Sequence, residues 1–576
     1  MRSARKIAHT ILNGYKKHYQ LFQHITATAP QAFAHADWQA IQSATTDRIS
    51  YYDIRVNETI DTLKAQLGEL TLTASEPLLW QNTRKIYHDL LLFHPQPELA
   101  ESFYNSVFCR LFHRSYFNND YIFVKTTLCE QPTIPCASEY QSYFPVVDGL
   151  KQTIRDIIAH FNFDVPFVNL ERDIRLLVKA FLKQAPSTHH YAHQMRFDIL
   201  KKPFYRNKAA YLIGRVVSKS GIQPFIVPVL HHYNHGLYLD ALITQSSQMR
   251  VIFGFARAYF MVETASPSAL VHFLNELMPN KTPAELYSAI GFHKQAKTQF
   301  YRELLNQLSQ TDQQFIPAAG TKGMVMTVFT LPTFPYVFKV IKDKFGSGKP
   351  FGRQTVLDRY QLVKRHDKVG RMADTIEYSN VALPLDKISP ELLSELKETV
   401  ASSLEFDGDL LIIKHLYIER RMTPLNLYLE QANEAQTRIV IDEYGQALKE
   451  MIAVNIFPGD MLLKNFGVTS HQRVIFYDYD EVQYLTDMNF RALPQPSNYD
   501  DYLMAESSYS VAPQDVFPEQ LTTFVTTNDT VRTLLKTLHP ELMDVKYWQQ
   551  AQQNIKAKKI ANICPYPKHL RFKNDW

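Results

Sequence analysis

The stretch NIFPGDMLLKNFGV, residues 455–468, decides the fold of the C-terminal half of the chain. Asp460 and Asn465 stand in it with D-x-x-x-x-N spacing, and Asp478 follows thirteen positions after Asn465, within VIFYDYDEV. Residues 467–473 can turn, and the apolar VIF can then return as a strand, which would bring Asp478 beside Asn465. A neighbouring Asp and Asn supply the oxygen ligands that Mg²⁺ takes when phosphates and water complete its shell. The stretch therefore predicts a metal–nucleotide site on a hairpin.

Two further features stand upstream, in the order found in kinases. A loop from Gly320 to Gly323, in AAGTKGMVM, lies between strand-like segments, and its glycines let backbone N–H groups approach phosphates. Lys339 follows in VFKVIK, where a mid-strand position directs one ammonium group at α- and β-phosphates. In kinases the Asp of D-x-x-x-x-N accepts the hydroxyl proton and the Asn holds Mg²⁺, roles that fall here to Asp460 and Asn465. Each piece is weak alone, but their joint order predicts a protein-kinase-like catalytic domain.

The chain of 576 residues, 45% of them hydrophobic, is too long for one core, so two or more domains are expected. Helical spacing of apolar residues dominates up to about residue 208 and again from 268 to 308. Between them lie four strand-like segments, at 210–217, 224–230, 237–243 and 250–256. The sequence therefore predicts an α+β protein. A mostly helical domain with a small antiparallel sheet, residues 1–312, precedes a bilobal protein-kinase-like domain, residues 313–576.

The C-terminal half lacks one expected feature, the helix glutamate that usually pairs with the strand lysine of a kinase. The helix predicted over residues 354–372 contains no Glu. Asp358, Asp367 and Glu377 are possible partners of Lys339, and the sequence does not choose among them. Further along, the pattern predicts a strand and two helices, at 410–417, 424–432 and 436–454.

Composition excludes several function classes. The chain carries 62 basic and 57 acidic residues, a net charge of +5, which does not indicate a nucleic-acid partner. Its four cysteines form no C-x-x-C pair and favour free thiols in a reducing compartment. The N-terminus has no apolar core for a signal peptide, and no stretch approaches the roughly 20 apolar residues of a membrane span. We therefore expect a soluble cytoplasmic protein with no membrane partner.

Six stretches resemble the isocitrate dehydrogenase kinase/phosphatase family: GMVMTVFTLP, VFKVIKD, YQLVKRHDKVGRMADT, HLYIERRMTPLN, NIFPGDMLLKNFGV and VIFYDYDEV. The resemblance covers the catalytic half and extends to VFPEQ, near residue 519, while the N-terminal half fits the family in length and character. It implies a kinase domain with an added, mostly helical regulatory domain. It also implies that kinase and phosphatase activities share one ATP/ADP site, which uses Mg²⁺ or alternatively Mn²⁺.

The resemblance further implies a partner. The protein substrate would be the homodimeric, NADP-dependent isocitrate dehydrogenase, phosphorylated on an active-site serine. That modification shuts the dehydrogenase off and so controls the branch between the tricarboxylic acid cycle and the glyoxylate bypass. AMP is expected as an allosteric effector that favours dephosphorylation.

The resemblance also carries residue roles. Asp374, in RMADT, matches a position that the family marks as active, particularly for the phosphatase. The segment with Glu419, Arg420 and Met422 resembles the hinge that meets adenine. Together with Lys339, the loop residues that would hold ATP are Ala318, Ala319, Gly320, Thr321, Lys322, Gly323 and Met324.

Two residues near the predicted metal site, Asp480 and Lys464, each have two possible roles. Asp480 replaces the glycine of the usual D-F-G, and it either orients or deprotonates the water in dephosphorylation, or binds a nearby Arg or backbone N–H as a structural carboxylate. Lys464 either neutralises the transferring phosphoryl group or is a surface lysine.

Two rival functions also stay open. FPGDMLLKN resembles the loops of aminoglycoside and choline kinases, which favours a small-molecule kinase. A nucleotide-sensing scaffold without activity is the other, although an intact set of Lys339, Asp460, Asn465 and Asp478 argues against it.

Overall fold

The N-terminal half begins with long helices that pack through one apolar face each. In α1 (Arg2–Thr26) the residues Ile7, Ile11 and Tyr15 recur at helical spacing and are all buried. Asp37 accepts the Ala40 N–H and so caps α3 (Trp38–Leu67), which packs along α1. This computed structural model describes residues 2–68, 77–112, 120–126, 139–184, 195–232, 235–254, 259–320, 322–346, 351–493 and 510–572. The other helices here are α2 (Ala29–Ala34), α4 (Pro77–Leu91) and α5 (Pro97–Leu111).

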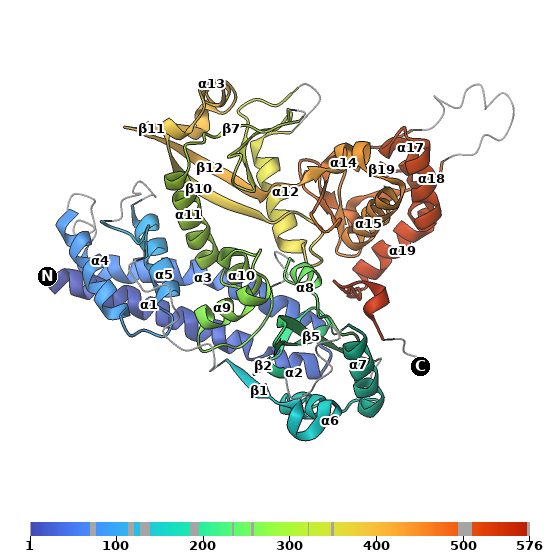
Figure 1. The fold of residues 1–576 in the computed structure, drawn as a ribbon. Coiled ribbons are helices and arrows are strands. Elements are labelled where there is room, and N and C mark those ends of the chain that lie inside the picture. The colour runs from blue at the N-terminus through green and yellow to red at the C-terminus, as the bar shows by residue number, and fades with distance from the viewer. Residues whose placement is uncertain are drawn as a thin grey trace.

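An antiparallel sheet follows these helices, as predicted (Figure 1). Its strand order is β1-β2-β4-β5-β6, with β3 paired to β4. Helices α6 (Pro145–His160) and α7 (Leu170–Gln184) pack against it, and apolar side chains of both share one core with the strands. The strands are β1 (Tyr140–Tyr143), β2 (Met195–Leu200), β3 (Phe204–Arg206), β4 (Ala209–Ser218), β5 (Gly221–His231) and β6 (Leu237–Leu239).

The prediction of a strand at residues 250–256 is wrong. Residues 250–252 end a helix, α8 (Ser246–Ile252), and residues 255–258 lie outside the described part of the chain. Met249 and Ile252, three positions apart, are both fully buried, as the inward face of a helix requires. A short apolar run does not distinguish a buried strand from a buried helix by periodicity, which explains the error.

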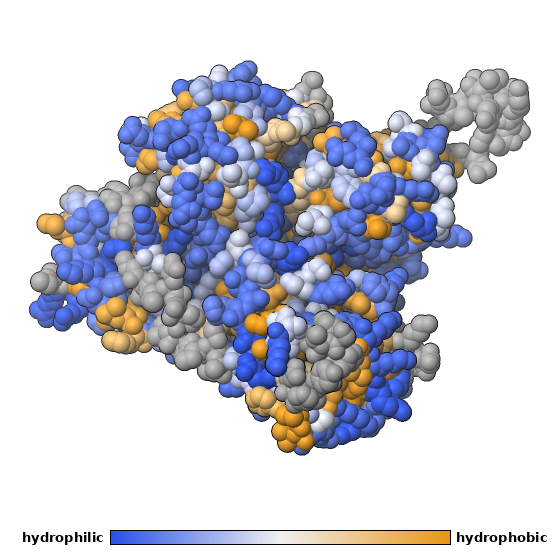
Figure 2. Space-filling view, in the orientation of Figure 1, coloured by the Kyte–Doolittle hydropathy of each residue, from blue (hydrophilic) through white to orange (hydrophobic). Residues whose placement is uncertain are grey.

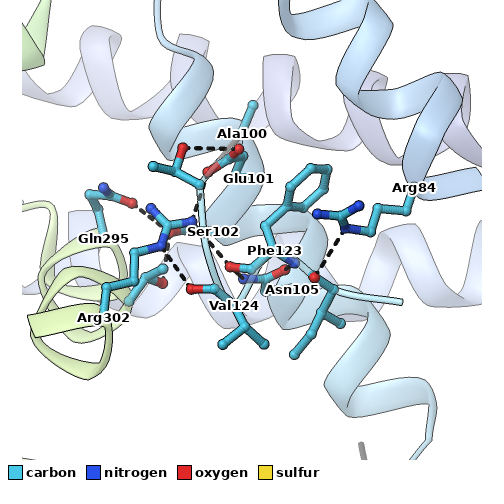
Figure 3. Close-up of polar contacts among 12 residues, drawn as sticks. Arg84, Ala100, Glu101, Ser102, Asn105, Phe123, Val124, Gln295 and Arg302 are labelled. Atoms are coloured by element: carbon cyan, nitrogen blue, oxygen red, sulfur yellow. Dashed lines mark hydrogen bonds and ion pairs between the residues drawn. The ribbon is translucent and has the colours of Figure 1, made fainter. Parts of the chain in front are cut away.

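Helix α11 (His293–Gln310) joins the N-terminal half to the sheet of the C-terminal half. It follows α9 (Pro267–Leu277) and α10 (Pro283–Ala289) and is fixed at its middle by Arg302. Arg302 pairs with the fully buried Glu101 of α5 at 2.7 Å and also donates to the carbonyls of Phe123 and Val124 (Figure 3). A buried charge pair that also satisfies backbone acceptors holds its elements in one geometry.

The C-terminal half is bilobal, and its first lobe, the N-lobe, is an antiparallel sheet with order β10-β12-β9-β8-β7 and with β11 on β12. Phe300 of α11, Phe338 and Leu416 belong to one core on one face of this sheet. Helix α12 (Arg353–His366) packs on the other face through Val356 and Tyr360. The remaining elements are β7 (Ile316–Pro317), β8 (Met326–Thr330), β9 (Tyr336–Ile341), β10 (Thr375–Pro384), α13 (Pro390–Thr399), β11 (Leu404–Asp407) and β12 (Leu410–Arg420).

Helix α12 ends six residues before the predicted position, at His366 instead of residue 372. The carboxylate of Asp367 accepts the N–H groups of Val369 and Gly370, and Gly370 has a φ of 65°. Such a side-chain turn competes with the helix and redirects the chain. Residues 367–374 therefore extend toward the second lobe, and strand β10, which the sequence analysis missed, begins directly afterwards.

The second lobe, the C-lobe, is built on α15 (Glu434–Ile452) around a large apolar core. Its final segment returns to the N-terminal half (Figure 1), where Arg571 binds both carboxylate oxygens of the buried Asp240. The other elements are β13 (Thr423–Pro424), α14 (Leu425–Gln431), β14 (Ile456–Phe457), β15 (Phe466–Val468), β16 (Val474–Phe476), β17 (Gln483–Tyr484), β18 (Asn489–Phe490), β19 (Asp515–Val516), α17 (Leu521–Val525), α18 (Asp529–Leu538) and α19 (Val545–Lys556).

Apolar residues gather at the lower edge of Figure 2, in the region of α6. Phe144, Val146 and Val147, at the start of α6, are exposed. Within the described ranges, none of the helices combines the length and the apolar composition that a membrane crossing requires. Cys109 and Cys564 are free thiols, as predicted, and Cys129 and Cys136 lie outside the described residues. The predicted fold class, a mostly helical part with a small antiparallel sheet before a bilobal kinase-like part, is confirmed.

Candidate active site

A cleft of about 2520 Å³ lies between the two lobes and extends along the N-terminal half. The N-lobe sheet forms one wall, and the loops after α15 form the other. Every predicted site residue within the described ranges lines this cleft, whereas Thr321 lies outside them. These residues are Ala318, Ala319, Gly320, Lys322, Gly323, Met324, Lys339, Asp374, Glu419, Arg420, Met422, Asp460, Lys464, Asn465, Asp478 and Asp480.

The glycine loop lies between two strands, as predicted, and these strands, β7 and β8, pair antiparallel. Gly320 has a φ of 112°, and a Cβ built on it would meet nothing within 4 Å, so conformation rather than space requires glycine there. Lys342 donates to the Gly323 carbonyl at 2.6 Å and holds the end of the loop. The ammonium group of Lys322 is bound by Glu395 of α13 at 2.9 Å. Backbone N–H groups of such a loop can bind a phosphate.

Lys339 is buried in β9 and pairs with Glu419 of the neighbouring strand β12, with 2.6 Å between Nζ and Oε2. Its Nζ also donates to the Tyr477 carbonyl at 3.1 Å. The lysine thus reaches from the N-lobe sheet to the residue before Asp478. One ammonium group therefore links the N-lobe sheet to the chain segment that carries Asp478.

None of the three partners suggested by the sequence pairs with Lys339. Asp358 accepts a hydrogen bond from the Gln354 side chain, and Asp367 accepts the backbone N–H of Gly370 in the turn that follows it. Glu377 is hydrogen-bonded to His415 at 3.0 Å. Helix α12 instead presents Tyr360, whose ring stacks on Tyr417 at 4.1 Å between centroids. The pairing was missed because Glu419 was assigned only to the adenine hinge. That segment does connect the lobes, since β12 ends at Arg420 and β13 begins at Thr423.

The loop that carries Asp460 is braced from several sides. The carboxylate of Asp460 accepts the Leu462 N–H at 3.0 Å, and the Asn465 side chain donates to the Asp460 carbonyl at 3.2 Å. Tyr444 of α15 donates its hydroxyl to the Met461 carbonyl at 2.7 Å. Asp460 remains half-buried at the cleft, so one carboxylate oxygen is directed by the loop while the group as a whole stays accessible. Lys464, three residues beyond Met461, is exposed.

The predicted hairpin between Asn465 and Asp478 is confirmed. Strand β15 pairs antiparallel with β16, with Phe466 opposite Phe476, and the Tyr477 N–H donates to the Asn465 carbonyl at 3.1 Å. Asn465 is buried and Asp478 is half-buried at the cleft. One amide oxygen and one carboxylate on adjacent chain segments fit a Mg²⁺ ion whose other ligands are phosphates and water.

Asp374 reaches the cleft through an arrangement that the sequence did not predict. The Ala373 N–H donates to the Phe476 carbonyl, the Phe476 N–H donates to the Arg371 carbonyl, and the Tyr479 hydroxyl donates to the Ala373 carbonyl. Residues 371–374 therefore run beside β16. Asp374 is held next to the segment that carries Asp478 and Asp480.

A buried charge network anchors that segment to α15. Arg371 pairs with Glu450 at 2.6 Å and with Glu443 at 2.5 Å and is almost fully buried. The neighbouring Arg473 lies 3.9 Å from Glu450, and burial followed by repulsion from Arg371 lowers its pKa to about 10. Glu443 and Glu450 stand seven positions apart on one face of α15, which is the signal that could have suggested a buried basic partner.

Asp480 lies at the cleft and is nearly buried. Arg359 of α12 lies near Asp480 and Glu481; burial lowers the pKa of this guanidinium, and the two carboxylates oppose that effect. The position at the cleft fits the water-orienting interpretation of Asp480, and the nearby guanidinium fits the structural interpretation.

The chemistry of the cleft is that of phosphoryl transfer. Backbone N–H groups and one lysine share the cleft with an Asn–Asp pair that could hold a metal ion, an aspartate that could accept a proton, and two further carboxylates. These two additional carboxylates, Asp374 and Asp480, also line the cleft.

Comparison with known proteins agrees with this chemistry. Residues 313–568 match the family model described as isocitrate dehydrogenase kinase/phosphatase (AceK) kinase domain, and residues 8–312 match the model of its regulatory domain. A protein of Pseudoalteromonas translucida named isocitrate dehydrogenase kinase/phosphatase 2 is 68% identical over 99% of this chain and 100% of its own. Proteins named isocitrate dehydrogenase kinase/phosphatase from Idiomarina loihiensis and Colwellia psychrerythraea are 55% and 50% identical, over 99% of this chain and 99% and 98% of theirs.

Proposed function

The chain belongs to the isocitrate dehydrogenase kinase/phosphatase family, and we propose on this basis that it adds phosphate to, and removes it from, a serine of NADP-dependent isocitrate dehydrogenase. The observation that carries the proposal is a single cleft lined by Lys339, Asp460, Asn465 and Asp478 together with the additional carboxylate Asp480. As a kinase-family enzyme it uses ATP, and a divalent cation accompanies the nucleotide.

In the kinase direction the residues divide the work as follows. The backbone of the Gly320–Gly323 loop and the ammonium group of Lys339 bind the phosphates of ATP. Asn465 and Asp478 would hold Mg²⁺, or alternatively Mn²⁺, which would neutralise charge on the transferring group. Asp460 orients the serine hydroxyl and accepts its proton while the serine oxygen attacks the γ-phosphorus and ADP leaves. The exposed side chain of Lys464 can reach the transferring group, and the lobe connection from Glu419 through Arg420 to Met422 meets the adenine.

In the phosphatase direction a water molecule attacks the phosphorus of phosphoserine in the same cleft, while nucleotide stays bound. The serine oxygen leaves and takes a proton, and inorganic phosphate is released. Asp480 orients or deprotonates the water, and Asp374, held beside the same segment, acts mainly in this direction. A carboxylate that acts in only one direction is what allows one cleft to carry two reactions.

The same proposal includes the metabolic setting. The substrate is the homodimeric dehydrogenase; its phosphorylation shuts it off and directs isocitrate into the glyoxylate bypass, and AMP shifts the balance toward dephosphorylation. The protein acts in the cytoplasm. We place the domain boundary at about residue 312, between a regulatory domain of residues 1–312 and a catalytic domain of residues 313–576, which the ranges matched by the two family models support.

The test is a time course with purified protein, isocitrate dehydrogenase, Mg²⁺ and γ-labelled ATP, followed by addition of ADP and AMP. Label should enter the dehydrogenase and then leave as free phosphate. Label that enters and never leaves would remove the phosphatase half of the proposal. No labelling, with ATP binding intact, would favour a small-molecule kinase or a scaffold.

A further inference from the structure

Three side chains from three adjacent strands meet on the cleft face of the N-lobe sheet. Lys339 of β9 stands opposite Tyr417 of β12, and Glu419, two residues further along β12, lies on the same face. Thr375 of β10 stands directly opposite Glu419. Strand register therefore places Thr375, Glu419 and Lys339 side by side, with the glutamate in the centre.

The contacts among the three are specific. Glu419 directs Oε2 to the Lys339 ammonium group at 2.6 Å, and its other oxygen, Oε1, accepts the Thr375 hydroxyl at 3.0 Å. Glu419 is 1% exposed, and Thr375 and Lys339 are each 8% exposed. The two oxygens of this buried carboxylate are thus held by two different donors from two different strands.

We propose that Thr375 is a positioning residue for nucleotide binding, acting through Glu419 on Lys339; this inference rests on the function proposed above. A buried carboxylate oxygen without a donor is costly, so loss of the hydroxyl leads the carboxylate to rotate toward another donor. Rotation moves Oε2 as well, and the Lys339 ammonium group follows its ion-pair partner. Threonine suits the task because branching at Cβ leaves its hydroxyl few rotamers.

This arrangement gives the lysine a partner that does not depend on α12. In protein kinases that partner is a glutamate on a mobile helix, whose position controls activation. Here α12 contributes Tyr360, stacked on Tyr417, and the ion pair lies entirely within the sheet. The position of β10 matters instead, and α11 holds that strand: Lys297 donates to the Glu377 carbonyl at 2.6 Å, and Tyr378 donates its hydroxyl to the Lys297 carbonyl at 2.7 Å.

The experiment compares nucleotide affinities of Thr375→Val, which keeps the shape and removes the hydroxyl, and Thr375→Ser, which keeps the hydroxyl. Affinities for Mg-ATP and for adenosine are measured by competition with a fluorescent ADP analogue, on full-length protein. Thr375→Val should weaken ATP about tenfold and leave adenosine unchanged, because the lysine meets only phosphates. The Glu419 side chain faces Lys339 and Thr375, so the adenine would meet only the backbone of the Glu419–Met422 connection. Thr375→Ser should restore ATP binding.

A matched control is Thr327→Val, because Thr327 is buried in the same sheet and its hydroxyl meets Thr399, away from the cleft, at 2.7 Å. This variant should lose thermal stability to a similar degree and keep its ATP affinity. A drop in ATP affinity in Thr327→Val equal to that in Thr375→Val would show a general effect of sheet stability and would overturn the proposal.

A double-mutant cycle with Glu419→Gln provides a second test that does not depend on how well Thr375→Val folds. Once Glu419 no longer directs Lys339, loss of the Thr375 hydroxyl should cost no further ATP affinity. Equal losses in both backgrounds would overturn the role of Thr375. Wild-type protein that binds no ATP would instead contradict the proposed function itself, so the two failures are distinguishable.

Discussion

Replacing Gly459 with Ala tests whether the Asp460 loop and the Asp478–Glu481 segment form one packed unit. Gly459 has a φ of 76°, and a Cβ at this position would lie 2.3 Å from the Glu481 carbonyl oxygen and 2.7 Å from the Glu481 Cβ. Contacts under 3.0 Å are essentially never seen for a real Cβ, and here the nearest atom is backbone, which cannot rotate away. The two segments must therefore separate.

The matched control is Gly408→Ala, in the turn between β11 and β12. Gly408 has a φ of 54°, and a Cβ there would meet nothing within 4 Å. Both variants incur the left-handed backbone strain of about 1–2 kcal/mol, so the difference between them isolates the contact with Glu481. A displacement on the order of 1 Å between reacting groups costs about 10²-fold in rate.

The assay measures initial rates of phosphorylation of the dehydrogenase, and of dephosphorylation of the phosphorylated dehydrogenase, at a temperature where both variants are folded. Gly459→Ala should lose about 10²-fold in both reactions, and Gly408→Ala should stay within about threefold of wild type. Equal rates in the two variants would show that the packing of Asp460 against the Asp478–Glu481 segment does not matter, and would refute this reasoning.

Two further predictions concern Asp480, at the cleft, and Lys297 of α11, which contacts β10. Asp480→Asn keeps the shape and removes the charge, so phosphatase rate should fall at least about tenfold more than kinase rate; equal losses would support the structural interpretation. Burial lowers the pKa of Lys297 to about 7, so between pH 7 and about 10.5 the unfolded chain binds one proton more than the folded chain. The melting temperature of the wild type minus that of Lys297→Met should therefore increase from pH 7 to 9, by the equivalent of at most about 1.4 kcal/mol of unfolding free energy per pH unit. A difference in melting temperature that stays constant over this range would contradict the burial of this amine.

The catalytic elements that could be predicted from the sequence are those set by local spacing. The sequence predicted that Asp478 lies beside Asn465, from the D-x-x-x-x-N spacing, the turn that follows it and the apolar VIF. In the structure the N–H of Tyr477, the residue before Asp478, donates to the Asn465 carbonyl. The glycine loop and the strand of Lys339 were likewise identified, because glycine and β-branched residues have strong local preferences.

Contacts between residues that lie far apart in the sequence could not be predicted from local patterns. The Lys339–Glu419 pair depends on the register between β9 and β12, which lie far apart in sequence and whose alignment no local pattern specifies. Strand β10 was missed, and with it the position of Thr375, since its mixed burial lacks strict alternation. The ion pairs of Arg371 could not be predicted either, because they form only when residues 371–374 pass beside α15. That path depends on α12 ending at His366.

The central claim is that one metal–nucleotide site serves both reactions. The most direct measurement is the rate of each reaction in Asp478→Ala, determined on the same preparation of dehydrogenase with Mg²⁺ and nucleotide present. We expect phosphorylation and dephosphorylation both to fall by about 10³-fold or more, because on this proposal each needs the metal held by Asp478. Dephosphorylation at the wild-type rate in a variant that has lost phosphorylation would contradict the shared site.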